Sequence, residues 1–514
     1  MKRKVAFLLL LLIIFFVAIP QAYADSTATT ACSNTMYKPT GQNFWVASPT
    51  TTNATGPVVV YVHGYSSDHY TWEGGNYAVR DACTNGFRVA AVDLDPSGSI
   101  WNNATDLKSK LQAIASYYGV SKVNIIAHSK GGLDTQTAIV HNSAYSLVQS
   151  YIAFGSPYGG TDLADHACSW YAWALWQCND ATWSMRTSYM SYVRSITDGR
   201  AENSYVRGYV ARGTKCDWYN PACAMISGSD DGVVPAWSVW ANASASRISD
   251  RSDLRHSEVH QTQRYGSWIF SYLGRSTARV EADGEALDVQ PLVEAESHFA
   301  SSNYTLRGGA LGNQVVEGIT VEGGLDAVTF SLISNAGVKV SVVSPSGVTY
   351  ESTAHAAATG DVLQGTTHAV RVEAPEAGQW QVLGTPTRRA GKGGGGFMLY
   401  AIYEGGLTVE LDTDIYQVYK PGTPLPLSIR TSEQVSNARV IANLQTRENK
   451  RVAAAQGELN GRTLALPHQA GSYTVDITVT GIAADGTPFE RTLVTSLAVG
   501  APAELGENGG IADR

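Results

Sequence analysis

The sequence predicts an α/β fold with a mostly parallel sheet, followed by C-terminal antiparallel β-sandwich domains. Two observations support this prediction. From Pro57 to Phe154, short apolar runs alternate with amphipathic stretches, a pattern typical of a parallel sheet with helices on both faces. Beyond about Arg275, apolar and polar residues alternate singly between turn signals, which favours β-sandwiches.

Four apolar runs and one long amphipathic stretch define the first region. The runs predict buried strands over Val58 to Val62, Phe87 to Val92, Val123 to Ala127 and Val148 to Phe154. The clearest helix is expected roughly from Ala104 to Tyr118, because its apolar residues fall on one face and Gly119 supplies a stop.

The second half is expected to contain two β-domains. Single alternation is clear in Tyr473, Val475, Ile477 and Val479, and we place a break near Tyr403 to Gly406. The predicted domains are a signal peptide at 1–24, an α/β domain at 25–277, a β-sandwich at 278–404, a second, immunoglobulin-like β-sandwich at 405–500 and a flexible tail at 501–514.

Length, charge and the N-terminus limit the class of protein. The 514 residues exceed what one hydrophobic core usually serves. Basic residues, an apolar run and Ala22-Tyr23-Ala24 at the start predict a signal peptide, and hence a secreted chain. No later segment has the apolar length of a membrane span, so we expect no integral membrane anchor. A net charge of −8 argues against nucleic acid as a partner. We expect a monomer.

All six cysteines lie in the first 223 residues, which in an exported chain suggests disulfides. Close sequence neighbours in loops can meet with little rearrangement of the chain. We therefore expect the pairs Cys168 with Cys178, Cys216 with Cys223, and Cys32 with Cys83. No CxxC pair or nearby histidine cluster supports the rival metal site, so no metal is expected.

A candidate nucleophile follows one of the predicted strands directly. Ser129 lies in Ala127-His128-Ser129-Lys130-Gly131, between a strand and a helical stretch, which is typical of a nucleophile elbow. His63-Gly64-Tyr65 follows the strand that ends at Val62, at the same predicted sheet edge. Because an ester's tetrahedral intermediate carries a negative oxygen, we expect the N–H groups of Tyr65 and Lys130 to form an oxyanion hole.

A serine nucleophile needs a base, and the base needs a carboxylate. Two adjacent acids, Asp230 and Asp231, follow a strand-like stretch downstream, and either could be the acid. Two histidines, His256 and His260, lie four residues apart near the end of the α/β region. Either could be the base.

With these motifs, the first 275 or so residues resemble secreted bacterial lipases and esterases of the α/β-hydrolase superfamily. The Ala-His-Ser-x-Gly form is similar to that of Bacillus-type lipases. The resemblance favours Asp231, which precedes Gly232 and an apolar stretch as in the lipase acid loop. It also favours His256, which lies nine residues before a predicted closing helix that starts at Tyr265. Lys130 departs from the Met common after the serine.

An aromatic-dense insertion lies between Ala167 and Tyr192. In the superfamily such insertions lie over the sheet edge that bears the site, so we interpret this one as a lid or an acyl-binding wall. The alternative is a cap domain that packs its own small core. Its aromatic residues are Trp170, Tyr171, Trp173, Trp176, Trp183, Tyr189 and Tyr192.

The sequence thus predicts a secreted serine hydrolase of carboxylic esters, a lipase or carboxylesterase that needs no cofactor. Its expected partner is an ester or lipid substrate, with an insoluble or interfacial substrate reached through the β-domains. The β-region is expected to be accessory, so a chain ending near Arg275 should keep the full rate on a soluble ester. Two alternatives are an extracellular polyester depolymerase and a surface-binding or adhesion protein with an inert hydrolase domain.

Overall fold

The computed structural model describes residues 31–50, 53–274, 300–357, 362–387, 395–459 and 461–500. The predicted signal peptide at 1–24 and tail at 501–514 lie outside these ranges. Within them, no helix is long and apolar enough to cross a membrane.

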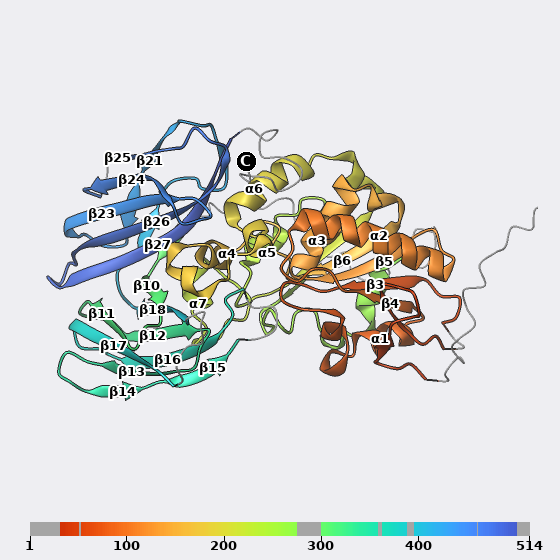
Figure 1. The fold of residues 1–514 in the computed structure, drawn as a ribbon, viewed down its shortest axis with the longest axis horizontal. Coiled ribbons are helices and arrows are strands. Elements are labelled where there is room, and N and C mark those ends of the chain that lie inside the picture. Colours follow the sequence, from red (N-terminus) through yellow and green to blue (C-terminus); the bar gives the residue numbers. More distant parts are fainter. Residues whose placement is uncertain are drawn as a thin grey trace, which may run out of the picture.

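A mixed, mostly parallel sheet forms the first half of the molecule (Figure 1). The strand order is β1-β2-β4-β3-β5-β6-β7-β8, and only β1 and β2 pair antiparallel with their neighbours. The predicted α/β class is therefore confirmed. The strands are β1 (Met36–Tyr37), β2 (Trp45–Ala47), β3 (Val58–Val62), β4 (Arg88–Val92), β5 (Val123–His128), β6 (Val148–Phe154), β7 (Arg207–Gly213) and β8 (Ala245–Arg251).

Helices follow the parallel strands, as the alternating pattern predicts. The longest, α2, runs over Ile100–Tyr118 and so starts earlier than expected, because the Ser99 side chain caps the N–H of Asn102. It ends where predicted, at Gly119, whose φ of 64° is left-handed. The others in this half are α1 (Ala78–Thr84), α3 (Lys130–His141), α7 (Ala222–Met225) and α8 (Ala236–Trp240), with short 3₁₀ helices η1 (His69–Trp72), η2 (Gly74–Asn76), η3 (Ala144–Ser146) and η5 (Ala201–Tyr205).

The predicted closing helix takes a different form. The segment folds into two short 3₁₀ helices, η6 (Thr262–Arg264) and η7 (Ser267–Tyr272). Gly266 separates them with a φ of 67°, a left-handed conformation that a continuous α-helix does not accommodate. The apolar side chains Ile269 and Phe270 still reach the core on this side of the sheet.

The insertion forms four helices in the middle of the molecule (Figure 1): α4 (Asp162–Ala167), η4 (Trp170–Leu175), α5 (Asp180–Ser184) and α6 (Thr187–Thr197). The Cys168–Cys178 disulfide links the start of η4 to the loop before α5. Cys32–Cys83 and Cys216–Cys223 are also bonded, so all three predicted pairs are confirmed.

Mostly antiparallel sheets, with one parallel pair (β20 and β27), make up the described residues beyond 300, and the predicted β-rich class of this half is confirmed. A five-stranded sheet (β10-β18-β12-β16-β15) and a four-stranded sheet (β11-β17-β13-β14) share one apolar core. Their strands are β10 (Tyr304–Ala310), β11 (Val315–Val321), β12 (Ala327–Ser334), β13 (Val338–Val343), β14 (Thr349–Glu351), β15 (Thr353–Ala356), β16 (Thr366–Glu373), β17 (Gly378–Pro386) and β18 (Gly396–Glu404).

Sheet membership changes after β18. A five-stranded sheet (β20-β27-β26-β23-β24), a three-stranded sheet (β22-β19-β9) and the pair β21-β25 share a second apolar core. The short strand β9 precedes β10 in sequence but pairs with β19 of this later group. The strands are β9 (Ala300–Ser302), β19 (Val409–Leu411), β20 (Val418–Tyr419), β21 (Pro424–Leu427), β22 (Ile429–Thr431), β23 (Ser436–Gln445), β24 (Arg451–Gly457), β25 (Arg462–Ala465), β26 (Gly471–Ile482) and β27 (Pro488–Val499).

Candidate active site

Ser129 occupies a sharp turn between β5 and α3. Its φ of 55° and ψ of −130° are unusual for a residue with a side chain, and such strain often marks functional sites. Small neighbours make the turn possible. A Cβ on Gly64 would lie 2.7 Å from the Cβ of Ser129, and one on Gly131 would collide with the carbonyl oxygen of His63. The strand, turn and helix around Ser129 are those that the motif predicts.

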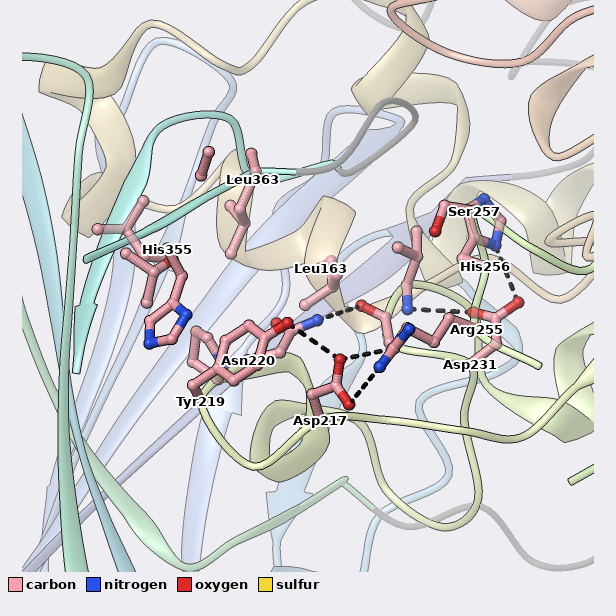
Figure 2. A pocket seen from close by; sticks show the side chains of 17 residues that line it. Leu163, Asp217, Tyr219, Asn220, Asp231, Arg255, His256, Ser257, His355 and Leu363 are labelled. Carbon is pink, nitrogen blue, oxygen red and sulfur yellow. Dashed lines mark hydrogen bonds and ion pairs between the residues drawn. The ribbon is translucent and has the colours of Figure 1, made fainter. Parts of the chain in front are cut away.

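His256 and Asp231 form a buried pair (Figure 2). The Nδ1 of His256 lies 2.9 Å from Oδ2 of Asp231, and the His256 backbone N–H donates to the carbonyl oxygen of Asp231 at 2.8 Å. The other carboxylate oxygen, Oδ1, accepts the N–H groups of Val233 and Val234. Because a carboxylate accepts, Nδ1 carries the ring proton and Nε2 offers its lone pair. That Nε2 is buried and makes no hydrogen bond within the described residues.

Ser129 and the Asp231–His256 pair both lie beside the end of β6. The N–H of Ser129 donates to the carbonyl oxygen of Phe154 at 2.9 Å. The next residue, Gly155, touches the pair: a Cβ there would lie 3.2 Å from both Oδ2 of Asp231 and Nδ1 of His256. Ser129 follows β5, whereas Asp231 and His256 lie in the loops after β7 and β8. Because these strands are parallel, all three residues belong to the same edge of the sheet.

Asp230 and His260, the alternative acid and base, lie close to the Asp231–His256 pair but make other contacts. The Oδ1 of Asp230 accepts the N–H of Gly232 at 2.7 Å, and burial raises the pKa of Asp230 to about 7. His260 packs edge-on against Trp72, and burial lowers its pKa to about 3. The structure therefore brings Asp231, rather than Asp230, to His256.

The two expected oxyanion donors flank Ser129. Neither the N–H of Tyr65 nor that of Lys130 donates a hydrogen bond within the described residues. His63 orients the first of them: its Nδ1 lies 2.8 Å from the carbonyl oxygen of Gly64, and its Nε2 accepts the N–H of Leu94 at 2.9 Å. The contact between His63 Nδ1 and the Gly64 carbonyl oxygen holds the peptide group that links Gly64 to Tyr65. His63 has no role of its own among the residues predicted from sequence, although its place beside Gly64 could have suggested one.

The side chain of Lys130 is turned to the interior of the protein. Its Nζ pairs with Oδ1 of Asp134 at 2.8 Å, and both side chains are buried. Asp134 also accepts from Asn103 of α2. Burial raises the pKa of Asp134, which the charge of Lys130 opposes. Lys130 thus anchors the start of α3, and only its backbone N–H is offered near Ser129.

The helical insertion lies against the residues of the site. The Nδ2 of Asn179 donates to the hydroxyl of Tyr65 at 3.1 Å, and Trp101 of α2 donates to the hydroxyl of Tyr189 at 2.7 Å. The insertion's aromatic residues divide into two groups: Trp170, Trp173 and Trp176 are exposed, whereas Tyr171, Trp183, Tyr189 and Tyr192 are buried. The latter belong to a core that also holds residues of the sheet, so the insertion does not pack a separate small core.

The opposite side of the insertion lies against the β-rich half. His166 lies between the hydroxyls of Tyr304 and Tyr400, at 3.1 Å from each. In α6, Arg186 donates to Thr474 at 2.9 Å, and the N–H of Ser188 donates to Ser496 at 3.1 Å. Apolar residues of β10, β18 and β27 belong to the same core as the sheet. The β-rich half is therefore packed directly onto the insertion.

A pocket beside the pair has walls from both halves of the chain (Figure 2). The first half contributes Asp231, His256 and Ser257, and the β-rich half contributes His355 and Leu363. Ser129 is not among its lining residues and is only 2% exposed. Little of the surface of the nucleophile candidate is therefore exposed in the described part of the chain.

Comparison with known proteins identifies the fold. No protein-family model matches the sequence, and the search of curated proteins finds no match. Among solved structures, the chain is similar to the Bacillus licheniformis lipase BlEst2 in its propeptide form, with 22% identity, a TM-score of 0.67, and coverage of 88% of this chain and 97% of that one. The mature form of that lipase matches at 26% identity over 46% of this chain and 97% of its own, with a TM-score of 0.40.

Proposed function

We propose that this chain, which has the α/β-hydrolase fold, is a secreted carboxylic ester hydrolase of the lipase or carboxylesterase type. One observation carries the proposal: a buried Asp231–His256 pair lies at the same sheet edge as the strained Ser129, and the His256 Nε2 has no hydrogen-bond partner in the part of the chain that the structure describes. Three disulfides support secretion, because such bonds persist in oxidising compartments.

The proposed reaction is acyl transfer to serine. The Oγ of Ser129 attacks the ester carbonyl carbon, and Nε2 of His256 takes its proton. Asp231 stabilises the resulting imidazolium, while the N–H groups of Tyr65 and Lys130 bind the negative oxygen. His256 then protonates the leaving alkoxide. Water, activated by the same histidine, releases the acid from the acyl-enzyme.

The Ser129→Ala variant tests this function. We expect ester turnover to fall by roughly 10³- to 10⁶-fold, because the nucleophile is lost. Labelling of the chain by a fluorophosphonate should disappear as well. The unfolding curve should stay near that of the wild type, since the change removes one oxygen. Wild-type labelling of the variant would show that another residue is the nucleophile.

We further propose that the full chain is the latent form of the enzyme and that the β-rich half is its removable cover. The fold is shared with a lipase structure described as a propeptide form. In this chain, the β-rich half packs onto the insertion and contributes a wall of the pocket beside His256. The proposed nucleophile, Ser129, is only 2% exposed in the same structure. This arrangement restricts the access of a substrate ester to Ser129, so the intact chain retains only part of the full activity.

A recognition site for a specific protease, placed between residues 274 and 300, tests whether the β-rich half lowers the activity of the first half. We expect the separated N-terminal part to hydrolyse a soluble short-chain ester severalfold faster than the intact chain. Cleavage without separation should give a smaller gain, because the apolar contacts persist. Equal rates for the intact and the separated protein would favour the accessory role expected from sequence and contradict the cover.

A further inference from the structure

His128 lies between the candidate nucleophile and the candidate base. It is the last residue of β5, directly before Ser129, and it is buried. Its Nε2 lies 3.0 Å from the backbone carbonyl oxygen of His256. Because a carbonyl oxygen can only accept, Nε2 of His128 carries a proton and donates it to this bond.

The bond completes a set of contacts that hold His256. The backbone N–H of His256 donates to the carbonyl of Asp231, and its ring donates to the carboxylate of the same residue. Both contacts attach the histidine to the acid. Among the described residues, the hydrogen bond from His128 attaches it to β5, the strand that directly precedes Ser129.

The surroundings of His128 keep its ring uncharged. The ring centroids of His128 and His256 are 4.7 Å apart, and those of His128 and His260 are 4.0 Å apart. Burial lowers the pKa of His128 well below its usual value, and the neighbouring His260, His256 and His63 lower it further. A neutral ring donates its bond without placing a second positive charge beside the His256 imidazolium.

We propose that His128 is a positioning residue, whose Nε2–H bond to the His256 carbonyl sets the distance between the nucleophile and the base. The proposal rests on the proposed function of Ser129 and His256. His260 contributes by packing: its ring lies against His128 on one side and against Trp72 on another. Displacement of a catalytic group by about 1 Å can cost roughly 10²-fold in rate, so one such bond can matter.

Two amide substitutions separate the hydrogen bond from the volume of the side chain. In His128→Gln the amide nitrogen reaches the position of Nε2, whereas in His128→Asn it reaches only that of Nδ1. We expect the Asn variant to lose roughly 10- to 100-fold in kcat for a soluble ester, with KM little changed. The Gln variant should regain most of this loss. The rate constant for fluorophosphonate labelling should follow kcat.

A distant histidine provides the control. His141 lies on α3, and its Nε2 is 3.0 Å from the hydroxyl of Thr197. His141→Gln and His141→Asn should therefore both leave kcat near the wild-type value. Unfolding curves of all four variants show whether a rate loss merely reflects lost stability.

The outcomes distinguish the two proposals. Equal kcat values for the Gln and Asn variants of His128, whether both high or both low, overturn the positioning role. Retained activity in Ser129→Ala overturns the proposed function instead, whatever the His128 variants do. A loss in His128→Asn that Gln restores, together with an inactive Ser129→Ala, supports both.

Discussion

At the scale of single residues, neighbours in sequence have opposite roles. Asp230 and Asp231 are adjacent, yet the first carboxylate accepts a backbone N–H of its own loop and the second holds the ring of His256. Burial raises the pKa of Asp230 to about 7. Asp231 accepts two backbone N–H groups besides the ring, and such bonds stabilise the charged carboxylate that an imidazolium partner requires.

The variants Asp231→Asn and Asp230→Asn test this division. Asp231→Asn should lower kcat by ~10⁴-fold, because an amide that donates to Nδ1 selects the wrong tautomer of His256. Asp230→Asn should keep most of the turnover, since an amide oxygen can still accept the N–H of Gly232. The kcat values of the two variants, measured on a soluble ester, show which aspartate is the partner of His256. A larger loss in Asp230→Asn would reverse the assignment.

At the scale of elements, the helical insertion is held by contacts to both halves of the chain and by two links within itself. Its hydrogen bonds reach Tyr65 of the first half and Thr474 of β26. Within it, the Cys168–Cys178 disulfide links the two sides of η4. Inside it, Arg186 pairs with Asp165, and both side chains are fully buried. The contacts with Tyr65 and Thr474 join the insertion to both halves of the chain.

Removal of the disulfides should destabilise the chain in the order of the loops that they close. In the chain-entropy model, the Cys168–Cys178 bond, which spans 10 residues, contributes about 2.5 kcal/mol. The Cys32–Cys83 bond spans 51 residues and contributes about 4 kcal/mol. Paired Cys→Ser variants, followed by chemical denaturation, give both values.

The Cys216–Cys223 pair, which spans 7 residues, is the matched control for Cys168–Cys178. Its removal should cost nearly the same. A much larger loss at Cys168–Cys178 would mean that its bond supports packing of the insertion beyond loop closure.

At the scale of the whole molecule, buried carboxyl groups lie where the halves meet. Asp162 begins α4, and burial, with Asp165 and Asp230 nearby, raises its pKa from 3.8 to about 8. Its charge acts on Tyr304 and Tyr416 of the β-rich half. The folded chain therefore prefers a protonated Asp162 near neutral pH.

This preference predicts a pH-dependent stability. Because the folded pKa lies above the unfolded value, the contribution of Asp162 is complete below about pH 4 and is lost as the pH rises through about 8. The free energy of unfolding should fall across this window, with a limiting slope of ~1.4 kcal/mol per pH unit for this group. Denaturation curves between pH 5 and pH 9 measure it.

Asp162→Asn is the control, because it removes the titrating group and keeps the shape of the side chain. Its unfolding free energy should depend less steeply on pH than that of the wild type, although Asp230 still titrates. Identical slopes in the two proteins would show that Asp162 does not carry the effect.

Much of this protein could be predicted from its sequence, because the features concerned are local. The period of apolar residues predicts strands such as β3 and β5, and a serine between a strand and a helix predicts the turn at Ser129. Short separations along the chain favour the disulfide pairs that the structure contains. Local signals of this kind depend on backbone geometry and near neighbours alone.

Only the tertiary structure decided which of two neighbours faces the site. Successive residues of a loop point in different directions, so the choice of Asp231 over Asp230 as the partner of His256 depends on how the loop after β7 is held. The bond from His128 to His256 joins residues 128 positions apart. The packing of β10 and β18 onto the helical insertion likewise joins residues more than 100 positions apart along the chain. Such contacts arise from long-range packing, which no local pattern of residues encodes.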